Sequence, residues 1–253
     1  MEAPRPADAG SPGHPRPEAV DDRKWIDALF WMSKTRLPWR DLPPAFGKWR
    51  SVHDRFVTWT RTGRWTRLFE LIGHREDLLA AFVDSTFFKA APCAAGAQKK
   101  QGPAQSRSRQ KLGQSRGGLT TKLHAAVDEE GRLAAAFITS GQASDAVRNG
   151  PRIARMSLAL EAKGICADKA YDTDEIVDLC ARANAEAVIP SKANRTVQRS
   201  HDAEKYKRRN VVERFFRRLR EHRRLCLMTD KLAPVFMSWA WLAAIKDWLA
   251  PGE

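Results

Sequence analysis

The sequence has few of the features that mark zinc-thiolate, secreted or membrane proteins. Its cysteines form no CxxC pair, so neither a zinc ribbon nor a disulfide framework is indicated, and they fit a reducing compartment: Cys93, Cys166, Cys180 and Cys226. The histidines include no HExxH or other paired spacing. There is no apolar run of about 18 residues to span a membrane, and the first residues lack the apolar segment of a signal peptide. We therefore expect a soluble, cytoplasmic protein with no membrane partner.

What the sequence has in excess is positive charge. It contains 44 Lys and Arg against 30 Asp and Glu, which gives a net charge of +14 and a pI of about 10.1. This balance favours an extended polyanion as partner, of which nucleic acid is the commonest. The 253 residues, 43% of them apolar, suffice for one large domain or two small ones with a real core.

The first 80 residues divide into a leader and a helical region. Residues 1–20 contain five Pro and two Gly without apolar periodicity, and we predict that they are disordered. Residues 21–80 carry three short helical patterns, which start at Asp21, at about 49 and at about 64. We interpret this region as a helix-turn-helix-like DNA-binding module. Its tryptophans favour core positions over base stacking: Trp25, Trp31, Trp39, Trp49, Trp59 and Trp65.

Residues 81–253 alternate between strand-like and helix-like patterns in the order β-β-β-α-β-α-β-α, and a final apolar helix follows. This order predicts an α/β fold with a mixed sheet and helices on both faces. The expected strands are 78–88, 119–127, 132–139, 164–167 and 187–189, and the expected helices are 143–160, 174–184, 206–220 and 232–249. Between them, residues 96–118 hold six Lys or Arg and no acid. We interpret that stretch as a mobile loop, with a solvated linker and a contact to DNA phosphates equally good explanations.

The predicted helix Tyr206–Arg220 carries one carboxylate on a cationic face. Tyr206, Arg209, Glu213 and Arg220 stand at offsets of 0, 3, 7 and 14, so on one continuous helix they fall within about 60° of one another. A run of charged residues on a helix is as often simply a solvent-exposed face as a functional site. A phosphodiester site would need further carboxylates to hold metal.

Two strand-end acids could supply those carboxylates. Asp84 lies on the first predicted strand, and Asp168 follows the fourth. If those two strands are neighbours, both carboxylates and Glu213 could enter one crevice and hold two divalent cations. Taken singly, Asp84 and Asp168 are better explained as strand-end or turn acids, and Asp172 and Asp174 are rivals to Asp168, although Asp174 looks more like a helix N-cap.

A set of motifs closely resembles the transposases of the IS5 family of bacterial insertion sequences. The catalytic-region motifs are Val83-Asp-Ser-Thr86, Ser115-Arg-Gly-Gly-Leu-Thr-Thr-Lys-Leu-His124, Gly141-Gln-Ala-Ser-Asp145, Ala167-Asp-Lys-Ala-Tyr-Asp172, Val188-Ile-Pro190 and Arg209-Asn-Val-Val-Glu-Arg-Phe-Phe216. Leu37-Pro-Trp-Arg-Asp-Leu-Pro43 and Gly47-Lys-Trp49 also look like that family. The resemblance covers about residues 21–249. One departure is the Pro-rich leader, which stands where family members commonly carry another helical segment.

The resemblance implies a DDE transposase with an RNase H-like (retroviral-integrase-like) core in residues 81–253. Asp84, Asp168 and Glu213 match the catalytic triad, which binds two Mg²⁺ ions, with Mn²⁺ as a substitute. Tyr206, Arg209, Glu213 and Arg220 match the Tyr-Arg-Glu-Lys signature of the related IS4-like group, with Arg in place of the usual Lys. Further DNA contacts are expected from Lys99, Lys100, Arg107, Arg109, Arg116 and Lys122.

The implied reaction is DNA transposition. The enzyme would nick the element ends hydrolytically and then join the exposed 3′-OH to target DNA, without a covalent enzyme intermediate. The implied partners are double-stranded terminal inverted repeats and target DNA, bound by a dimer or larger assembly at the bacterial nucleoid. Two alternatives stay open at this point: an inactive or truncated DNA-binding copy, and a metal-dependent nuclease of the same fold.

Overall fold

The computed structural model describes residues 21–73, 78–96, 110–115, 118–144 and 148–250. Its first part is helical, as the sequence predicts, and consists of α1 (Asp22–Thr35), η1 (Trp39–Asp41), η2 (Pro44–Phe46), α2 (Trp49–Arg61) and α3 (Arg64–Ile72). The predicted disordered leader, residues 1–20, lies outside the described residues. Across the described ranges, no helix is both long and apolar enough to cross a bilayer.

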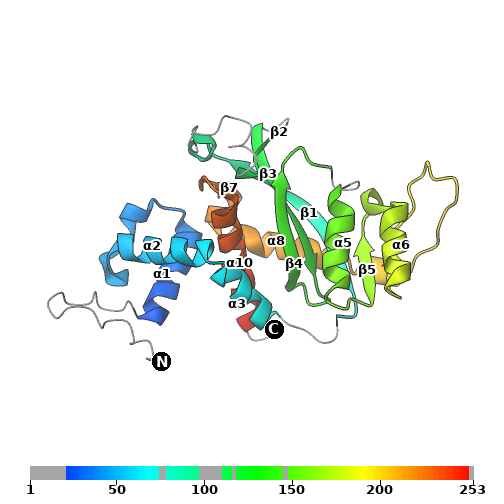
Figure 1. The fold of residues 1–253 in the computed structure, drawn as a ribbon, viewed down its shortest axis with the longest axis horizontal. Helices are drawn as coiled ribbons and strands as arrows, with labels where there is room; N and C mark the ends of the chain where they lie inside the picture. The colour runs from blue at the N-terminus through cyan, green and yellow to red at the C-terminus, as the bar shows by residue number, and fades with distance from the viewer. Residues whose placement is uncertain (1–20, 74–77, 97–109, 116–117, 145–147, 251–253) are drawn as a thin grey trace, which may run out of the picture.

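The second part alternates strands and helices (Figure 1). Its elements are β1 (Ala81–Ala90), η3 (Pro92–Gly96), β2 (Gly113–Ser115), β3 (Gly118–Val127), β4 (Leu133–Ser140), α5 (Gly150–Leu158), β5 (Gly164–Ala167), η6 (Lys169–Tyr171), α6 (Asp174–Arg182), β6 (Glu186–Val188), α7 (Ala203–Lys207), α8 (Asn210–Glu221), α9 (Arg223–Cys226), β7 (Leu227–Met228) and α10 (Ala233–Leu249).

Strand β1 is the centre of a mixed sheet. It pairs antiparallel with β3 along eight residues and parallel with β5, with Val83 opposite Ala167. Strand β4 continues antiparallel from β3, and β6 continues parallel from β5. The predicted mixed sheet is confirmed, as is the condition that the first strand and the strand before Asp168 are neighbours.

The two faces of the sheet are covered by different helices, because alternate residues of β1 point to opposite sides. Phe82 and Phe88 enter a core shared with α8 and α10, whereas Ala81 and Val83 enter a core shared with α5 and α6. Helices α5 and α6 lie on the near side in Figure 1, with α8 behind the sheet. Side chains of α8 that point toward the sheet therefore meet the even-numbered residues of β1.

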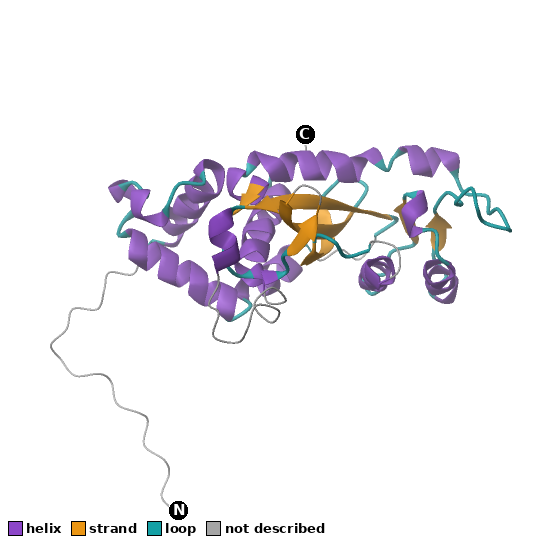
Figure 2. Cartoon of the chain, turned by 90° about the horizontal axis from the view of Figure 1, so that it is seen from above, coloured by secondary structure: helices purple, strands orange, loops and turns teal. Residues whose placement is uncertain are grey.

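The N-terminal helices are anchored to α10 by aromatic contacts. Phe56 of α2 stacks on Trp239 at 4.3 Å between ring centroids, and Phe69 of α3 stacks on Trp241 at 4.4 Å. Trp25 and Trp65 are each 1% exposed, so the prediction of core positions is confirmed for them. Burying side chains of this size contributes roughly 1.5–3 kcal/mol each. Figure 2 shows the N-terminal helices to one side of the sheet.

Two predicted helices have different bounds because of local backbone chemistry. The predicted helix 206–220 is wrong as one continuous element. It divides into α7 and α8, because Arg208 and Arg209 donate to carbonyls three residues back, in the tighter pattern of a 3₁₀ turn. The helix expected over 143–160 begins only at Gly150. Pro151 has no N–H to donate and is tolerated only in the first turn.

Other elements of the described residues also differ from the prediction. The third N-terminal helix stops at Ile72 rather than near residue 80, with Gly73 as its C-cap. Within the predicted loop 96–118, Gly113–Ser115 forms strand β2 against β3. Most of the remaining loop lies outside the described residues. The two-residue strand β7, which pairs with the end of β1, was not predicted either, since so short a run has no periodicity to detect.

A buried histidine makes the stability of this fold depend on pH. His222 is 4% exposed, and its Nδ1 shares a 2.8 Å hydrogen bond with Ser33 Oγ. Burial, together with the charges of Lys246 and Lys34, lowers the pKa of His222 from 6.5 to about 4. Between pH 6.5 and about 4, His222 therefore binds a proton in the unfolded chain but not in the folded chain. Stability should therefore fall by roughly 3 kcal/mol as the pH drops through this window.

We expect His222→Asn to remove this contribution. Thermal unfolding of the wild type and the variant, followed between pH 7 and 4, should give a shallower loss for the variant, because asparagine does not titrate. Equal slopes for the two proteins would show that His222 is not the group that responds.

Candidate active site

Two of the predicted carboxylates are brought together by the sheet. Asp84 follows Val83 on β1, and Asp168 follows Ala167 at the end of β5, where Val83 and Ala167 are direct partners. Both acids therefore stand one residue beyond the same pair, on the face that α8 covers. The charge of Asp168 contributes to raising the pKa of Asp84, as expected of neighbouring carboxylates.

Asp84 is held in a half-buried, cationic environment. Its Oδ1 accepts a hydrogen bond from the N–H of Ser85 at 2.7 Å, and its Oδ2 accepts from Arg209 Nη1 at 2.9 Å. Burial raises the pKa of Asp84 above its usual range, and Asp168 adds to this effect while Ser85 and Arg209 oppose it. A cation at this point would relieve both the desolvation of Asp84 and its repulsion from Asp168.

Asp168 and Asp172 have different structural roles. Asp168 Oδ1 accepts from the N–H of Ala170 at 2.8 Å and so begins the turn η6. Asp172 is 5% exposed and accepts from the N–H of Lys192 at 2.9 Å and from Arg195 and Arg199. Burial by itself would raise the pKa of Asp172, but these donors outweigh burial and lower the pKa below its usual range. Asp172 thus anchors the loop that contains Lys192, Arg195 and Arg199.

Asp174, the second rival to Asp168, belongs to the same anchor. It pairs with Arg195 at 2.8 Å and also with Arg199. The interpretation of Asp174 as a helix N-cap is wrong, since Thr173 caps α6 and its Oγ1 accepts from the N–H of Ile176 at 3.3 Å. Asp168 is therefore the acid of this segment that faces the site.

Arg209 connects the third carboxylate to the first. Its Nη1 binds Asp84 and its Nη2 donates to Glu213 at 2.7 Å. Glu213 lies in the first turn of α8, where the helix dipole favours a negative charge, and its side chain is 57% exposed. Within the described ranges, no three His, Cys, Asp or Glu side chains are spaced to hold a metal ion. The guanidinium of Arg209 occupies the space between Asp84 and Glu213.

The other two members of the predicted constellation lie beside these carboxylates. Tyr206 at the end of α7 is half-buried and interacts electrostatically with Arg209. Arg220 at the end of α8 donates to Thr86 Oγ1, two residues along β1 from Asp84 on the same face. Although α7 and α8 are separate, Tyr206 stays close to Arg209, and Arg209 and Arg220 both bind residues of β1.

The remaining predicted DNA contacts are only partly described. Lys99, Lys100, Arg107, Arg109 and Arg116 lie outside the described residues. Lys122 of β3 is 4% exposed; its Nζ donates to the carbonyl of Ala143 at 3.0 Å and lies 4.4 Å from the ring centroid of Phe87. Phe87 is on the face of β1 opposite to Asp84, so the structure does not bring Lys122 to the carboxylates.

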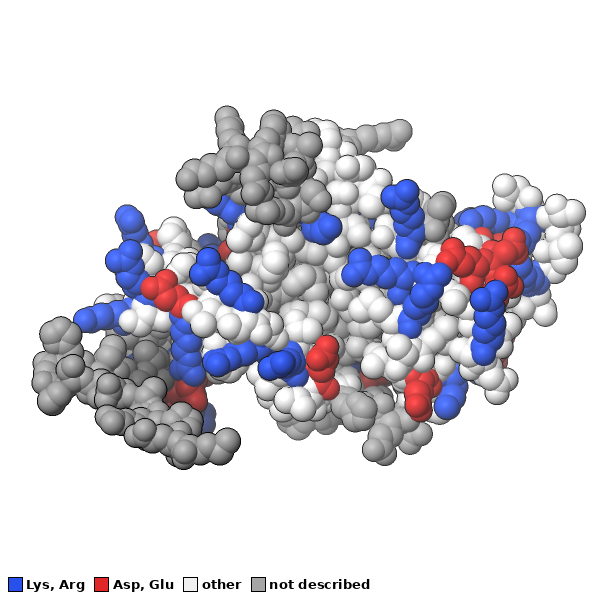
Figure 3. Space-filling view, viewed as in Figure 1, with Lys and Arg blue, Asp and Glu red and all other residues white. Residues whose placement is uncertain are grey.

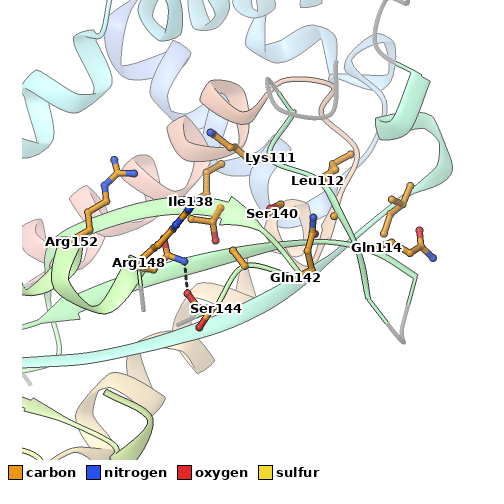
Figure 4. Close-up of a pocket in the computed structure, with 14 residues that line it drawn as sticks. Lys111, Leu112, Gln114, Ile138, Ser140, Gln142, Ser144, Arg148 and Arg152 are labelled. Carbon is orange, nitrogen blue, oxygen red and sulfur yellow. Dashed lines mark hydrogen bonds between the residues drawn. The ribbon is translucent and has the colours of Figure 1, made fainter. Parts of the chain in front are cut away.

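A cationic hollow that the sequence did not indicate lies between the β2–β3 edge and α5. Its volume is about 780 Å³, and it is lined by polar side chains and by Lys111, Arg148 and Arg152, with no acid among its lining residues. Figure 4 shows these three cations around the hollow, with Asn149 bonded to the carbonyl of Ser144. The only sequence signal was that Arg148 and Arg152 are four residues apart. Figure 3 shows further Lys and Arg side chains on the same face, over the N-terminal helices and near α5.

Comparison with known families matches both parts of the chain. Residues 76–245, well over half of the sequence, match the family model described as "Transposase DDE domain". Residues 2–69 match the family model described as "Putative transposase of IS4/5 family (DUF4096)".

Two curated proteins are similar to this chain. One is "Putative transposase for insertion sequence element IS6501" from Brucella ovis, 32% identical over 133 residues, which cover 52% of this chain and 99% of that protein. The other is "Uncharacterized protein y4sN" from Sinorhizobium fredii, 34% identical over 83 residues, which cover 33% of this chain and 66% of that protein.

Solved structures of Mos1 transposase align with this chain at low similarity. The "Mos1 transposase paired-end complex with left transposon end" covers 97% of this chain and 84% of its own, with 13% identity and a TM-score of 0.29. The "Crystal structure of the Mos1 mariner paired end complex with Mn" covers 94% and 80%, with 12% identity and a TM-score of 0.28. At these TM-scores, the alignments do not bear on the candidate site of this chain.

Proposed function

Because this chain belongs to the IS4/IS5-like transposases with a DDE domain, we propose that it cleaves the ends of an insertion element and joins the exposed 3′-OH strand to target DNA. The observation that carries this proposal is the placement of Asp84 and Asp168 on neighbouring parallel strands, with Glu213 connected to Asp84 through Arg209. Asp84 and Glu213 thus share one guanidinium next to Asp168, at a place where a divalent cation could take the position of the guanidinium.

The carboxylates fit a divalent cation by their chemistry. Oxygen ligands are those that Mg²⁺ and Mn²⁺ prefer, and the raised pKa of Asp84 marks negative charge that a cation would stabilise. We propose that Asp84, Asp168 and Glu213 hold two Mg²⁺ ions, for which Mn²⁺ can substitute. When bound, the ions would activate the attacking oxygen and stabilise the leaving oxygen. Glu213 has the exposure needed to turn toward Asp84 once Arg209 is released.

The basic side chains around the carboxylates would bind the DNA backbone. Arg209 has a planar guanidinium that binds phosphate as readily as carboxylate, so a scissile phosphate would compete with Asp84 and Glu213 for it. Arg220 near Thr86 would bind a second phosphate along β1, and the Tyr206 hydroxyl would donate to the same backbone. Lys99, Lys100, Arg107, Arg109 and Arg116 remain proposed DNA contacts, and Lys111, Arg148 and Arg152 join them. Lys122 is not proposed again, because it is 4% exposed and its Nζ donates to the carbonyl of Ala143.

The partners follow from the reaction. Two double-stranded element ends must be joined to one target, which requires at least a dimer on DNA, at the bacterial nucleoid. The N-terminal helices of residues 21–80 would recognise the inverted repeats, and residues 81–253 would perform the chemistry.

Because the interface with DNA would be driven by charge, we predict that the affinity for duplex DNA falls steeply between low and moderate salt.

The test is an assay on a plasmid that carries the element's inverted repeats, with Mg²⁺, with Mn²⁺ and with chelator. We expect nicks at the repeat ends and joined products, both of which require the metal. Nicks without joined products would favour a nuclease of the same fold. DNA binding with no cleavage under either metal would instead identify an inactive copy and contradict the proposal.

A further inference from the structure

A second pocket lies at the junction of the N-terminal helices with the core, built by the two N-terminal motifs that the catalytic site leaves unused. Of these motifs, Leu37–Arg40 and Trp49 line the pocket, together with Cys93, Arg224 and residues 229–231. Its volume is about 550 Å³, within the range of sites for small organic ligands. Gly47 has a φ of 95°, which glycine adopts without steric cost and which lets the chain turn into α2 with Trp49 as its first residue.

Three aromatic rings line this pocket. Trp39 and His53 are in edge contact at 5.0 Å, and Trp49 lies 6.4 Å from His53. Trp39 is fixed from behind by Phe56 and Trp239, each with its centroid at 5.8 Å. Trp39 and Trp49 are both half-buried, so part of each indole stays accessible in the pocket.

The pocket also carries an excess of positive charge. Its lining includes Arg36, Arg40, Arg224 and Lys231 against a single acid, Asp230. Arg224 and Asp230 form a buried pair at 3.7 Å. Arg36, Arg40 and Lys231 are exposed, and none of them has an ion pair within the described ranges. Arg40 lies 6.0 Å from the ring centroid of Trp49, so its charge is held beside that ring.

Arg36 is kept in a conformation that arginine rarely adopts. It ends α1 with a φ of 59° in the left-handed region, where glycine is the usual residue and a larger side chain is strained. Glycine would suit this backbone better. Arg36 lines the pocket, as does Arg40.

Resting on the proposed function, we propose that this pocket binds an unstacked nucleotide of a single DNA strand, with the base against Trp49 and Trp39 and the phosphates on Arg36, Arg40 and Lys231. Aromatic faces combined with a cationic rim are the features that bind single-stranded nucleic acid. A contact with an intact duplex backbone requires only the cations. The concave, Trp-lined shape therefore favours an unpaired base.

The position of the pocket suits a strand that leaves the carboxylates. Strand β1 runs from Asp84 to Ala90, roughly 20 Å at the rise of a β-strand, and Cys93 of the pocket follows directly. On the other side, α8 with Arg220 leads into α9 with Arg224. If the two strands of a DNA end separate at Asp84, Asp168 and Glu213, one of the strands could therefore reach the pocket within a few nucleotides.

The experiment measures binding of a short oligothymidylate by fluorescence anisotropy and by quenching of tryptophan emission, at low salt. We expect Trp49→Ala and Arg36→Gly each to weaken binding at least about fivefold, the lower end of the effect of one base–aromatic stack. Trp49→Phe should restore most of the affinity. Arg61→Gln, which removes an exposed cation of α2 away from the pocket, should bind like the wild type.

Arg36→Gly keeps the test valid if Trp49→Ala fails to fold, because glycine relieves the strained φ and should not lower the unfolding temperature. Wild-type affinity in both Arg36→Gly and the Arg36→Gly, Arg40→Gln double variant would overturn the proposal. An equal loss of affinity for blunt duplex would also overturn it and mark a backbone contact instead. The cleavage assay on wild-type protein tests the proposed function separately. If the protein binds oligothymidylate through this pocket but never cuts DNA, the pocket proposal is supported and the proposed function is refuted.

Discussion

Replacing Glu213 by glutamine is expected to abolish metal-dependent DNA cleavage while leaving the stability of the fold unchanged. Glutamine keeps the shape of the side chain but removes the charge that a divalent ion requires from its ligand. Metal ions contribute several kcal/mol to stabilising the transition state, so the loss should be on the order of a thousandfold or more. Glu213 is exposed and pairs only with Arg209 among the described residues, and such pairs contribute about 0–1 kcal/mol.

Glu221→Gln provides the matched control. Glu221 ends the same helix and is exposed, so its neutralisation changes the net charge equally without touching Asp84 or Arg209. Cleavage rates and unfolding temperatures should be measured for both variants and the wild type. If Glu213→Gln retained full activity, or if Glu221→Gln lost as much as Glu213→Gln, Glu213 would not be the third carboxylate.

Replacing Arg224 by alanine is expected to destabilise the whole protein by about 3–5 kcal/mol, the cost of leaving one partner of a buried pair alone. Arg224 is 5% exposed and donates to the carbonyl of Leu37 at 3.2 Å. Its guanidinium lies 5.2 Å from the centroid of Trp39 and 5.0 Å from that of Trp239. It therefore joins three segments: the turn after α1, the start of α9 and the helix α10.

Urea unfolding measures this loss, with Arg223→Ala as the control. Arg223 is the adjacent residue of α9 and is exposed, so its removal should change stability by less than about 0.5 kcal/mol. Asp230→Asn added to Arg224→Ala should recover part of the loss, because burial already raises the pKa of Asp230 and a neutral side chain suits that environment better. Equal stability of the Arg223 and Arg224 variants would contradict the account of this junction.

Sequence patterns predicted the sheet and the positions of the acids because both depend on local periodicity and chain order. The run that ends at Asp84 and the short run before Asp168 each have strand character, and the alternation of strands with helices implied a mixed sheet. That these two strands are neighbours was a condition for a shared site and not a prediction from the sequence, and the pairing of Val83 with Ala167 meets this condition.

What the sequence could not decide depends on contacts between distant residues. Asp168 and Asp172 look alike in sequence, and only the binding of Asp172 by Arg195 and Arg199 separates the anchor from the site. The ion pair between Arg209 and Asp84 joins residues 125 positions apart in the sequence. It forms at the break between α7 and α8, which could not be predicted because the apolar periodicity continues through it. The pocket at Trp39 and Trp49 required the fold to bring residues 229–231 beside the N-terminal motifs.

The most direct test of the central claim, that Asp84, Asp168 and Glu213 hold metal together, is to map where a bound metal cuts the polypeptide. Fe²⁺ would replace Mg²⁺ in the protein bound to DNA, and ascorbate with peroxide would generate radicals at the ion. The account predicts chain breaks next to Asp84, Asp168 and Glu213, all suppressed by excess Mg²⁺. Breaks at two of these positions but not at Glu213, or breaks that Mg²⁺ does not suppress, would contradict it.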